Sequence, residues 1–189
     1  MSYAIPTNEL ALNDIRQYKE KALNAGIATA KAAGIAATDL ELVYREALPA
    51  FDMGVTVAAG AGWAAEYYRT PAAAGALAWA SLFGLAAATD PFLPVRRVVV
   101  FYKVYDATAL ALTTAVRFLL ATATTKGVFF LQNLFGVKLE PEAWFSEPVV
   151  YSPQDQINMD FYAKAATPAA GEELGFGAFI IERIGGTVS

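Results

Sequence analysis

Five carboxylates near a proline-rich segment are the first candidates for chemistry: Glu140, Glu142, Glu147, Asp155 and Asp160. Two carboxylates held about 5 to 9.5 Å apart can hydrolyse a glycosidic bond, and carboxylate clusters bind Ca²⁺. Their spacing requires neither arrangement, and no loop of the form D-x-[DN]-x-[DN]-G occurs. We therefore expect them on a solvated loop rim, and we assign no catalytic residue and no metal ligand.

Aromatic side chains in the same region are the next candidates. Trp144, Phe145 and Tyr151 could stack on a sugar, which would make the chain a carbohydrate- or ligand-binding β-sandwich. Aromatic residues of such folds more often fill the core, and subunit interfaces are their next most common use. We therefore keep ligand binding as the alternative and expect no small-molecule substrate.

Positive charge is sparse. The net charge is -4, and no basic cluster exceeds the pair Arg96-Arg97, so we expect no direct, sequence-specific binding of nucleic acid. We expect Arg96, Arg97 and Arg117 to form ion pairs between subunits or to solvate a sheet edge.

A glycine-rich segment resembles a dinucleotide-binding fingerprint. Gly60 and Gly62 begin a G-x-G-x-x-A pattern after an apolar run. The helix that this motif requires would be cut off at Thr70-Pro71, and no acidic residue follows at about 20 residues, where the ribose needs one. We expect no cofactor here, and a nucleotide-binding enzyme is the least favoured alternative.

Histidine and cysteine are absent from the 189 residues. One chain therefore cannot supply a Ser-His-Asp triad, a cysteine nucleophile or His-ligated zinc.

Apolar residues make up 56% and charged residues 17%, so there are few charged side chains to cover the surface. We expect copies of the chain, other proteins or lipid to cover part of it. The first residues lack the basic start and apolar core of a signal peptide, so we expect no secretion by that route.

Residues 1–50 are expected to form a helical N-terminal arm. Asn8 is a candidate N-cap, and Gly26 is expected to end the helix, although residues 27–37 could extend it. Thr38-x-x-Glu41 has the form of a capping box and predicts a short helix through Arg45. The sequence leaves open whether this arm packs on its own sheet or on a neighbouring subunit.

Residues 51–189 are expected to form an antiparallel β-sandwich, with the strongest strand signal over 95–184. Residues 71–89 carry no charge but are rich in alanine, which predicts a tightly packed internal element, helix or strand, rather than a membrane span. Residues 95–105 predict a central strand and 114–122 a second one. A turn at 124–127 should lead to a returning strand at 128–135, and the prolines of 141–153 predict loops and short edge segments.

The last strands follow from alternation. Residues 157–165 alternate apolar and polar side chains, which predicts a strand with one solvated face. Residues 174–184 predict another strand, and the turn-rich residues between them predict that the two form one long antiparallel hairpin.

The stretch EPVVYSPQDQINMDFYAKAATPAAGEELGFGAFIIERIGG resembles the C-terminal hairpins of jelly-roll virion proteins from icosahedral bacteriophages. The resemblance lies in the pattern of strands and covers only the second half of the chain. It implies a jelly-roll sandwich and a non-enzymatic structural protein, a capsid or decoration subunit that self-assembles into a homo-oligomeric shell. The implied partners are other copies, other virion proteins and a lipid layer, and the implied location is the virion, assembled in the host cytoplasm. A receptor-binding virion component is the form that the ligand-binding alternative would take.

Overall fold

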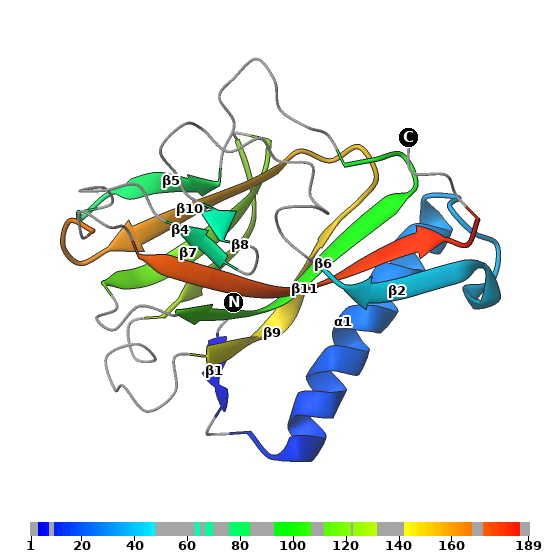
Figure 1. Ribbon diagram of the computed structural model, residues 1–189, viewed down its shortest axis with the longest axis horizontal. Coiled ribbons are helices and arrows are strands. Elements are labelled where there is room, and N and C mark those ends of the chain that lie inside the picture. Colours follow the sequence, from blue (N-terminus) through cyan, green and yellow to red (C-terminus); the bar gives the residue numbers. More distant parts are fainter. Residues whose placement is uncertain are drawn as a thin grey trace.

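Among the residues that the structure describes, the protein is mainly β, with one long helix and two antiparallel sheets (Figure 1). The structure, a computed structural model, describes residues 4–7, 10–47, 63–64, 67–69, 76–83, 93–106, 112–121, 123–131, 142–167 and 172–185. The expected end of the helical N-terminal arm, residue 50, lies outside these ranges. The described residues before it are not purely helical, because they also contribute two strands to the larger sheet.

The larger sheet has seven strands in the order β1-β9-β6-β11-β4-β3, and β2 also pairs with β11. These strands are β1 (Ala4–Pro6), β2 (Leu42–Glu46), β3 (Trp63–Ala64), β4 (Tyr67–Arg69), β6 (Arg97–Asp106), β9 (Glu142–Tyr151) and β11 (Glu173–Arg183). The smaller sheet has four strands in the order β5-β10-β7-β8. They are β5 (Trp79–Phe83), β7 (Thr113–Leu120), β8 (Thr124–Phe130) and β10 (Ile157–Ala163).

The main core lies between the two sheets. Strand β6 sends Val99, Phe101 and Val104 into it, and β7 sends Phe118 from the opposite sheet. The Phe101 and Phe118 rings lie 5.1 Å apart. Burying each such ring removes a large apolar surface from water, so this layer supplies much of the free energy that holds the sheets face to face.

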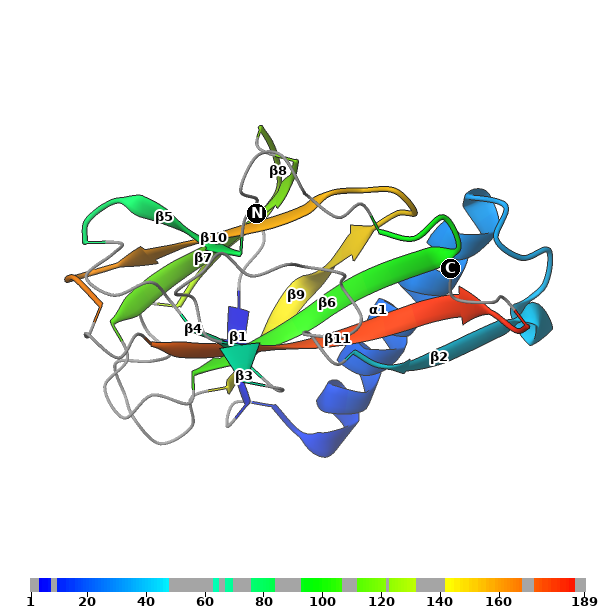
Figure 2. The same ribbon diagram turned by 45° about the horizontal axis from the view of Figure 1, so that its top comes forward.

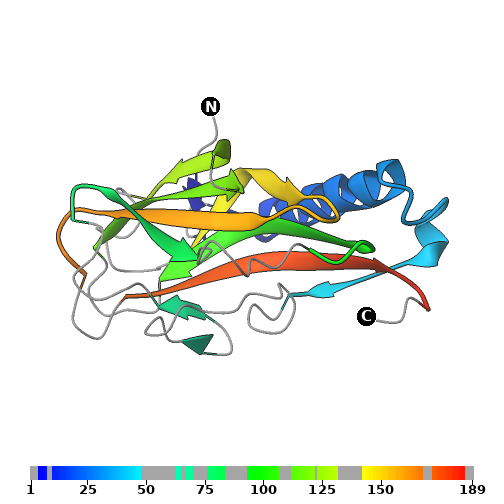
Figure 3. The same cartoon turned by 90° about the horizontal axis from the view of Figure 1, so that it is seen from above.

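A second core lies on the other face of the larger sheet, under helix α1 (Leu12–Ala32). Because side chains of a strand alternate between faces, β6 also presents Val98, Val100 and Tyr102 to the helix. Figures 2 and 3 show the resulting arrangement, with β6 and β11 running from the smaller sheet at one end to α1 at the other. Strand β6 is central and buried on both faces, which confirms the prediction for residues 95–105.

Helix α1 does not end at Gly26, contrary to the sequence-based expectation. Gly26 lies in the middle of the helix and is buried against the sheet, where an added Cβ would overlap Ile181 and lie 2.6 Å from Val100 Cγ2. The helix begins at Leu12, where Asp14 accepts a hydrogen bond from the Ala11 N–H at 2.9 Å. The proposed cap Asn8 lies outside the described residues.

Helix α1 ends at Ala32 and is closed by Gly34, whose φ of 72° suits a residue without Cβ. The N–H groups of Gly34 and Ile35 donate to the carbonyls of Lys31 and Ala30 at 3.0 Å each, and this pair of bonds is a Schellman motif. Residues 27–32 therefore extend the first helix, one of the two outcomes that the sequence allowed.

Tyr44 and Arg45 lie in a strand, so the short helix predicted through Arg45 is wrong. The Thr38-x-x-Glu41 segment forms only one 3-10 turn, Asp39–Glu41, and the chain then enters β2. Strand β2 pairs with the end of β11, from Phe179 to Arg183. Pairing with an available strand edge outweighs the local preference for a helix start.

The turn predicted at 124–127 is also wrong, because β8 already begins at Thr124. The chain reverses earlier, at Ala121, which has a positive φ of 53°.

The proline-rich segment, expected as loops and edges, instead contains the ten-residue strand β9. Pro148 lies in a bulge of β9. Phe101 of β6 pairs with Val149 and Lys103 pairs with Trp144, so Pro148 has no pairing partner in β6, and its lack of an N–H group is tolerated there.

Strands β10 and β11 do not form the predicted hairpin, because they belong to different sheets. Strand β10 pairs with β5 and β7, whereas β11 pairs with β6, β2 and β4. The polar face of β10 is also not solvated, since Asn158 and Asp160 are buried. Asp160 tolerates this position because Arg117 on β7 neutralises it.

The pairings of the last eight strands are nested. Going inward from the ends, β4 pairs with β11, β5 with β10, β6 with β9, and β7 with β8, all antiparallel. Two further antiparallel pairings, β6 with β11 and β7 with β10, join these pairs into the two sheets.

Within residues 71–89 the described part contains strand β5, and no described helix is long and apolar enough to cross a membrane.

Replacing Gly26 by valine should lower the free energy of unfolding by about 2 kcal/mol, because the new side chain would push α1 away from Val100 and Ile181. The matched control is Ala28→Val on the exposed face of the helix, which should cost only about 0.5 kcal/mol through helix propensity. Urea denaturation followed by circular dichroism measures both. Equal losses in the two variants would contradict the close approach at Gly26.

Replacing Glu172 by alanine should cost about 3 kcal/mol, because it would leave buried donors without an acceptor. The Glu172 carboxylate is fully buried and accepts hydrogen bonds from the N–H groups of Leu112 and Thr113 and from the Thr113 hydroxyl, at 2.8 to 3.1 Å. Glu172→Gln keeps one acceptor oxygen and should lose clearly less. Identical unfolding midpoints for the two variants would show that these bonds do not hold the start of β7.

Candidate functional site

The carboxylates singled out in the sequence do not come together. Each described one pairs with a different cation of the same chain: Glu142 with Lys103 (3.0 Å), Glu147 with Lys21 (2.7 Å), Asp155 with Lys126 (3.2 Å) and Asp160 with Arg117 (2.6 Å). Glu140 lies outside the described residues. Among the residues that the structure describes, no three potential ligands lie close enough to hold a metal ion. The expectation of a solvated rim is wrong for Asp160, which is buried on β10.

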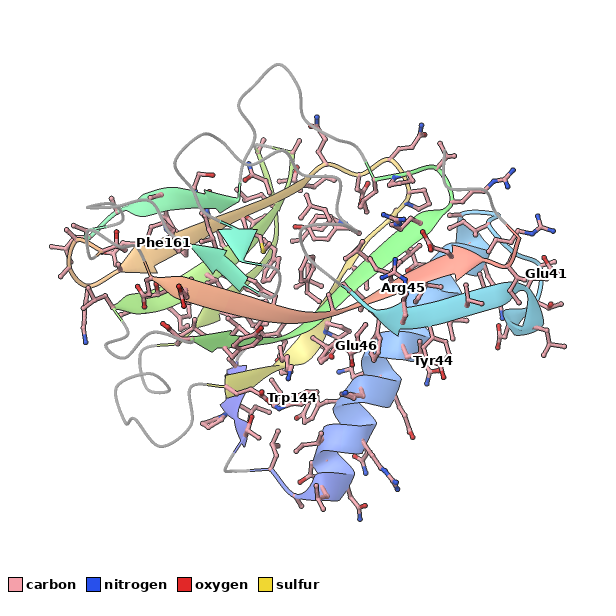
Figure 4. All side chains as sticks on the ribbon, in the orientation of Figure 1. Glu41, Tyr44, Arg45, Glu46, Trp144 and Phe161 are labelled. Atoms are coloured by element: carbon pink, nitrogen blue, oxygen red, sulfur yellow. The ribbon has the colours of Figure 1, made fainter. Side chains whose placement is uncertain are left out.

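The three candidate aromatic residues are core residues. Trp144, labelled in Figure 4, stacks on Tyr102 with ring centroids 5.4 Å apart. Phe145 stacks on Phe129 at 3.9 Å, and the Tyr151 hydroxyl donates to the carbonyl of Leu119 at 2.9 Å. All three side chains are buried, which confirms the core role that the sequence favoured and leaves these residues unable to form the alternative, a sugar-stacking platform.

Two of the three arginines form ion pairs within the chain, whereas the sequence led us to expect ion pairs between subunits or solvation of a sheet edge. Arg97 contacts Glu182 at 2.6 Å in a largely buried pair that joins β6 to β11. Arg117 contacts Asp160 and lies 4.6 Å from the centre of the Trp79 ring. Arg96 is exposed beside Arg97. The glycines of the dinucleotide-like motif, Gly60 and Gly62, lie outside the described part of the chain.

Strand β2 is the exposed element with the clearest chemical character. It forms one margin of the larger sheet (Figure 3) and pairs with β11 on one side, and no described strand pairs with its other side. We call this surface the β2 edge and define it as residues Leu40–Glu46 with Ile184. Strand edges of this kind present unpaired backbone groups that can pair with another chain.

The backbone hydrogen bonds at the ends of β2 fix which groups point outward. The carbonyl of Glu41 accepts from Ile184 N–H at 2.7 Å, and Ala47 N–H donates to Ala178 at 2.8 Å. Hydrogen-bonded pairs alternate with non-hydrogen-bonded pairs in an antiparallel ladder. Val43 and Arg45 therefore also bond to β11, while Leu42, Tyr44 and Glu46 direct their N–H and C=O groups outward.

The β2 edge is apolar for an exposed surface. Leu40 is 89% exposed, Tyr44 56% and Val43 47%, and Ile184 beside them is also exposed. Large apolar side chains gathered at an unpaired strand edge are typical of a contact surface. Figure 4 shows Tyr44, Arg45 and Glu46 on this strand, in front of α1.

The edge is also held firmly in place. The Tyr102 hydroxyl on β6 donates to the Glu46 carboxylate, which also binds Lys19 of α1 at 3.1 Å. Burial, together with this hydrogen bond, raises the pKa of Tyr102 far above its ordinary value. Tyr44 packs edge-on against Phe179. A rigid strand loses little entropy when a partner binds, which favours association.

The sequence carries only a weak signal for this strand. Leu42-Val43-Tyr44 is rich in β-branched and aromatic character, but it follows a capping box, and five residues are too few for period-two alternation to stand out.

Comparison of the chain with protein-family models, with curated proteins and with solved structures found no match in any of the three.

Proposed function

We propose that the chain is a structural subunit of an icosahedral bacteriophage shell, a capsid or decoration protein built on a jelly roll. The observation that carries the proposal is the nested pairing of β4 to β11. Eight strands joined in this order are a single long antiparallel hairpin that has been rolled into two facing sheets. This wrapping supports a jelly roll, a fold used by viral capsids and by lectins.

The rolled arrangement accounts for both sheets. If the innermost pair is β7–β8 and the outermost is β4–β11, rolling brings β11 against β6 and β10 against β7. These pairings give the orders β9-β6-β11-β4 and β8-β7-β10-β5, four strands in each sheet. Strands β1, β2 and β3 are then additions at the margins of one sheet.

Among the functions that this fold serves, assembly fits the surface best. The chain is 56% apolar and 17% charged, and apolar side chains gather at the β2 edge. The aromatic residues that would favour a lectin-like or receptor-binding role are buried, so the described part of the chain does not favour that alternative. Because a jelly roll can serve several functions, the exposed β2 edge is the feature that favours assembly.

The proposal assigns no catalytic residue, cofactor or metal. Its partners are other copies of the chain and other virion proteins, with a lipid layer as a further neighbour, and its location is the virion, assembled in the host cytoplasm. The N-terminal region serves assembly through β2, because α1 is already packed on the sheet of its own chain.

Sedimentation velocity on untagged protein tests the proposal. The protein should form particles on the order of megadaltons, alone or with its co-purifying virion proteins, because closed shells contain many symmetric copies. Electron microscopy of the fast fraction should show particles of uniform diameter. A 20.1 kDa monomer that stays monomeric at high concentration, in the presence of those proteins, would contradict the proposal.

A further inference from the structure

We propose that the β2 edge binds the same edge of a second copy, as an antiparallel strand pair around a two-fold axis at Val43. The inference rests on the proposed function in that it names one contact between copies. The pair would join the larger sheets of two subunits into one continuous sheet. An interface of this kind is self-complementary, so each residue contact occurs twice.

The outward backbone groups limit how two copies can pair. Leu42, Tyr44 and Glu46 point their N–H and C=O groups away from β11, so only these residues can form the hydrogen-bonded pairs of the new ladder. A two-fold axis then passes through Tyr44, through Val43 or through Arg45. These are the three registers that keep the centre of β2 paired.

Side-chain chemistry separates these three registers. An axis at Arg45 would place two guanidinium groups directly opposite each other, which is destabilising. An axis at Tyr44 would place Arg45 opposite Val43, a charge against an apolar side chain, on both sides of the axis.

The axis at Val43 gives matched pairs throughout. Val43 then faces Val43, Leu42 faces Tyr44 twice, and Glu41 faces Arg45 twice. The Glu41–Arg45 positions are non-hydrogen-bonded pairs, where side chains on neighbouring strands approach most closely. Charge complementarity therefore favours a second copy of this chain in this register over an unrelated partner.

The surroundings of the edge support the same register. Glu41 already lies 3.3 Å from Arg183, so Arg45 of the second copy would complete an alternating row of charges, Arg-Glu-Arg. On the other face, the Leu42 and Tyr44 side chains of both copies would form one apolar stripe. This stripe would continue the core beneath α1, to which Leu42 already belongs.

Single-cysteine variants test the register directly, because the chain contains no cysteine. In Val43→Cys the two Cα atoms would lie about 4.5 Å apart, as expected for a non-hydrogen-bonded pair and within the range of a disulfide. We expect this variant to form a covalent dimer under mild oxidation of dilute protein. The matched control Tyr44→Cys should stay largely uncross-linked, and Glu41→Cys mixed with Arg45→Cys should give a mixed disulfide.

Two other cross-linking results would contradict the proposal. A dimer from Tyr44→Cys but not from Val43→Cys would overturn the proposed register. No dimer from any of these variants, with the thiols shown to react with a maleimide, would overturn the β2 contact.

A charge exchange provides a second, independent test. Arg45→Glu should weaken dimerisation about tenfold, because it sets Glu41 against a like charge on both sides of the axis. Adding Glu41→Lys should restore part of that loss, since the cross-strand pairs are again of opposite sign, while the new lysine also lies beside Arg183 of its own chain. Sedimentation equilibrium measures the dissociation constants, and circular dichroism checks that each variant is folded. Failure of the double variant to recover, with all variants folded, would contradict the pairing.

The same measurements separate this inference from the proposed function. Shell-sized particles whose Val43→Cys subunits do not cross-link would overturn the β2 pairing and leave the shell proposal standing. Cross-linked dimers that never form larger species, even with other virion proteins, would overturn the shell proposal and leave the β2 pairing standing.

Discussion

The antiparallel pair of β6 and β11 is the constraint on which the rest of the structure depends. Both strands are buried on both faces, and each belongs to the core between the sheets and to the core beneath α1. The helix can approach closely only because Gly26 has no side chain. Loss of packing on one face would therefore disturb the other, so the two cores are expected to unfold as one cooperative unit.

Composition and periodicity predicted the class of the fold well. The apolar run at 95–105 carries enough β-branched residues to identify a strand buried on both faces, and β6 is that strand. The alternation at 157–163 identified β10 but not its neighbours, because period two does not say which sheet a strand joins or what covers its polar face. The ion pair between Asp160 and Arg117 links residues 43 positions apart, and no local pattern could reveal it.

The candidate site was harder to predict than the fold. Carboxylates and aromatic residues drew attention because their chemistry is versatile, yet Trp144 is held in the core by Tyr102 and by a hydrogen bond to Thr7. The β2 edge carries no unusual residue type. Its character comes from position, because only the fold shows that Leu42–Glu46 pairs with β11 on one side and that Tyr102 anchors it.

Strand β11 offers the same edge to two strands, β2 at Phe179–Arg183 and β4 at Glu173 and Leu174. The two contacts differ in how they would carry a mechanical load. A pull on β2 along its own axis strains all of its bonds to β11 in shear, so they must break together, and Glu46 ties the strand to α1 as well. The short pairing with β4 has few bonds among which to share a load. If copies pair at the β2 edge as proposed, the stress on that edge would pass through β11 into both cores and spread over the whole chain.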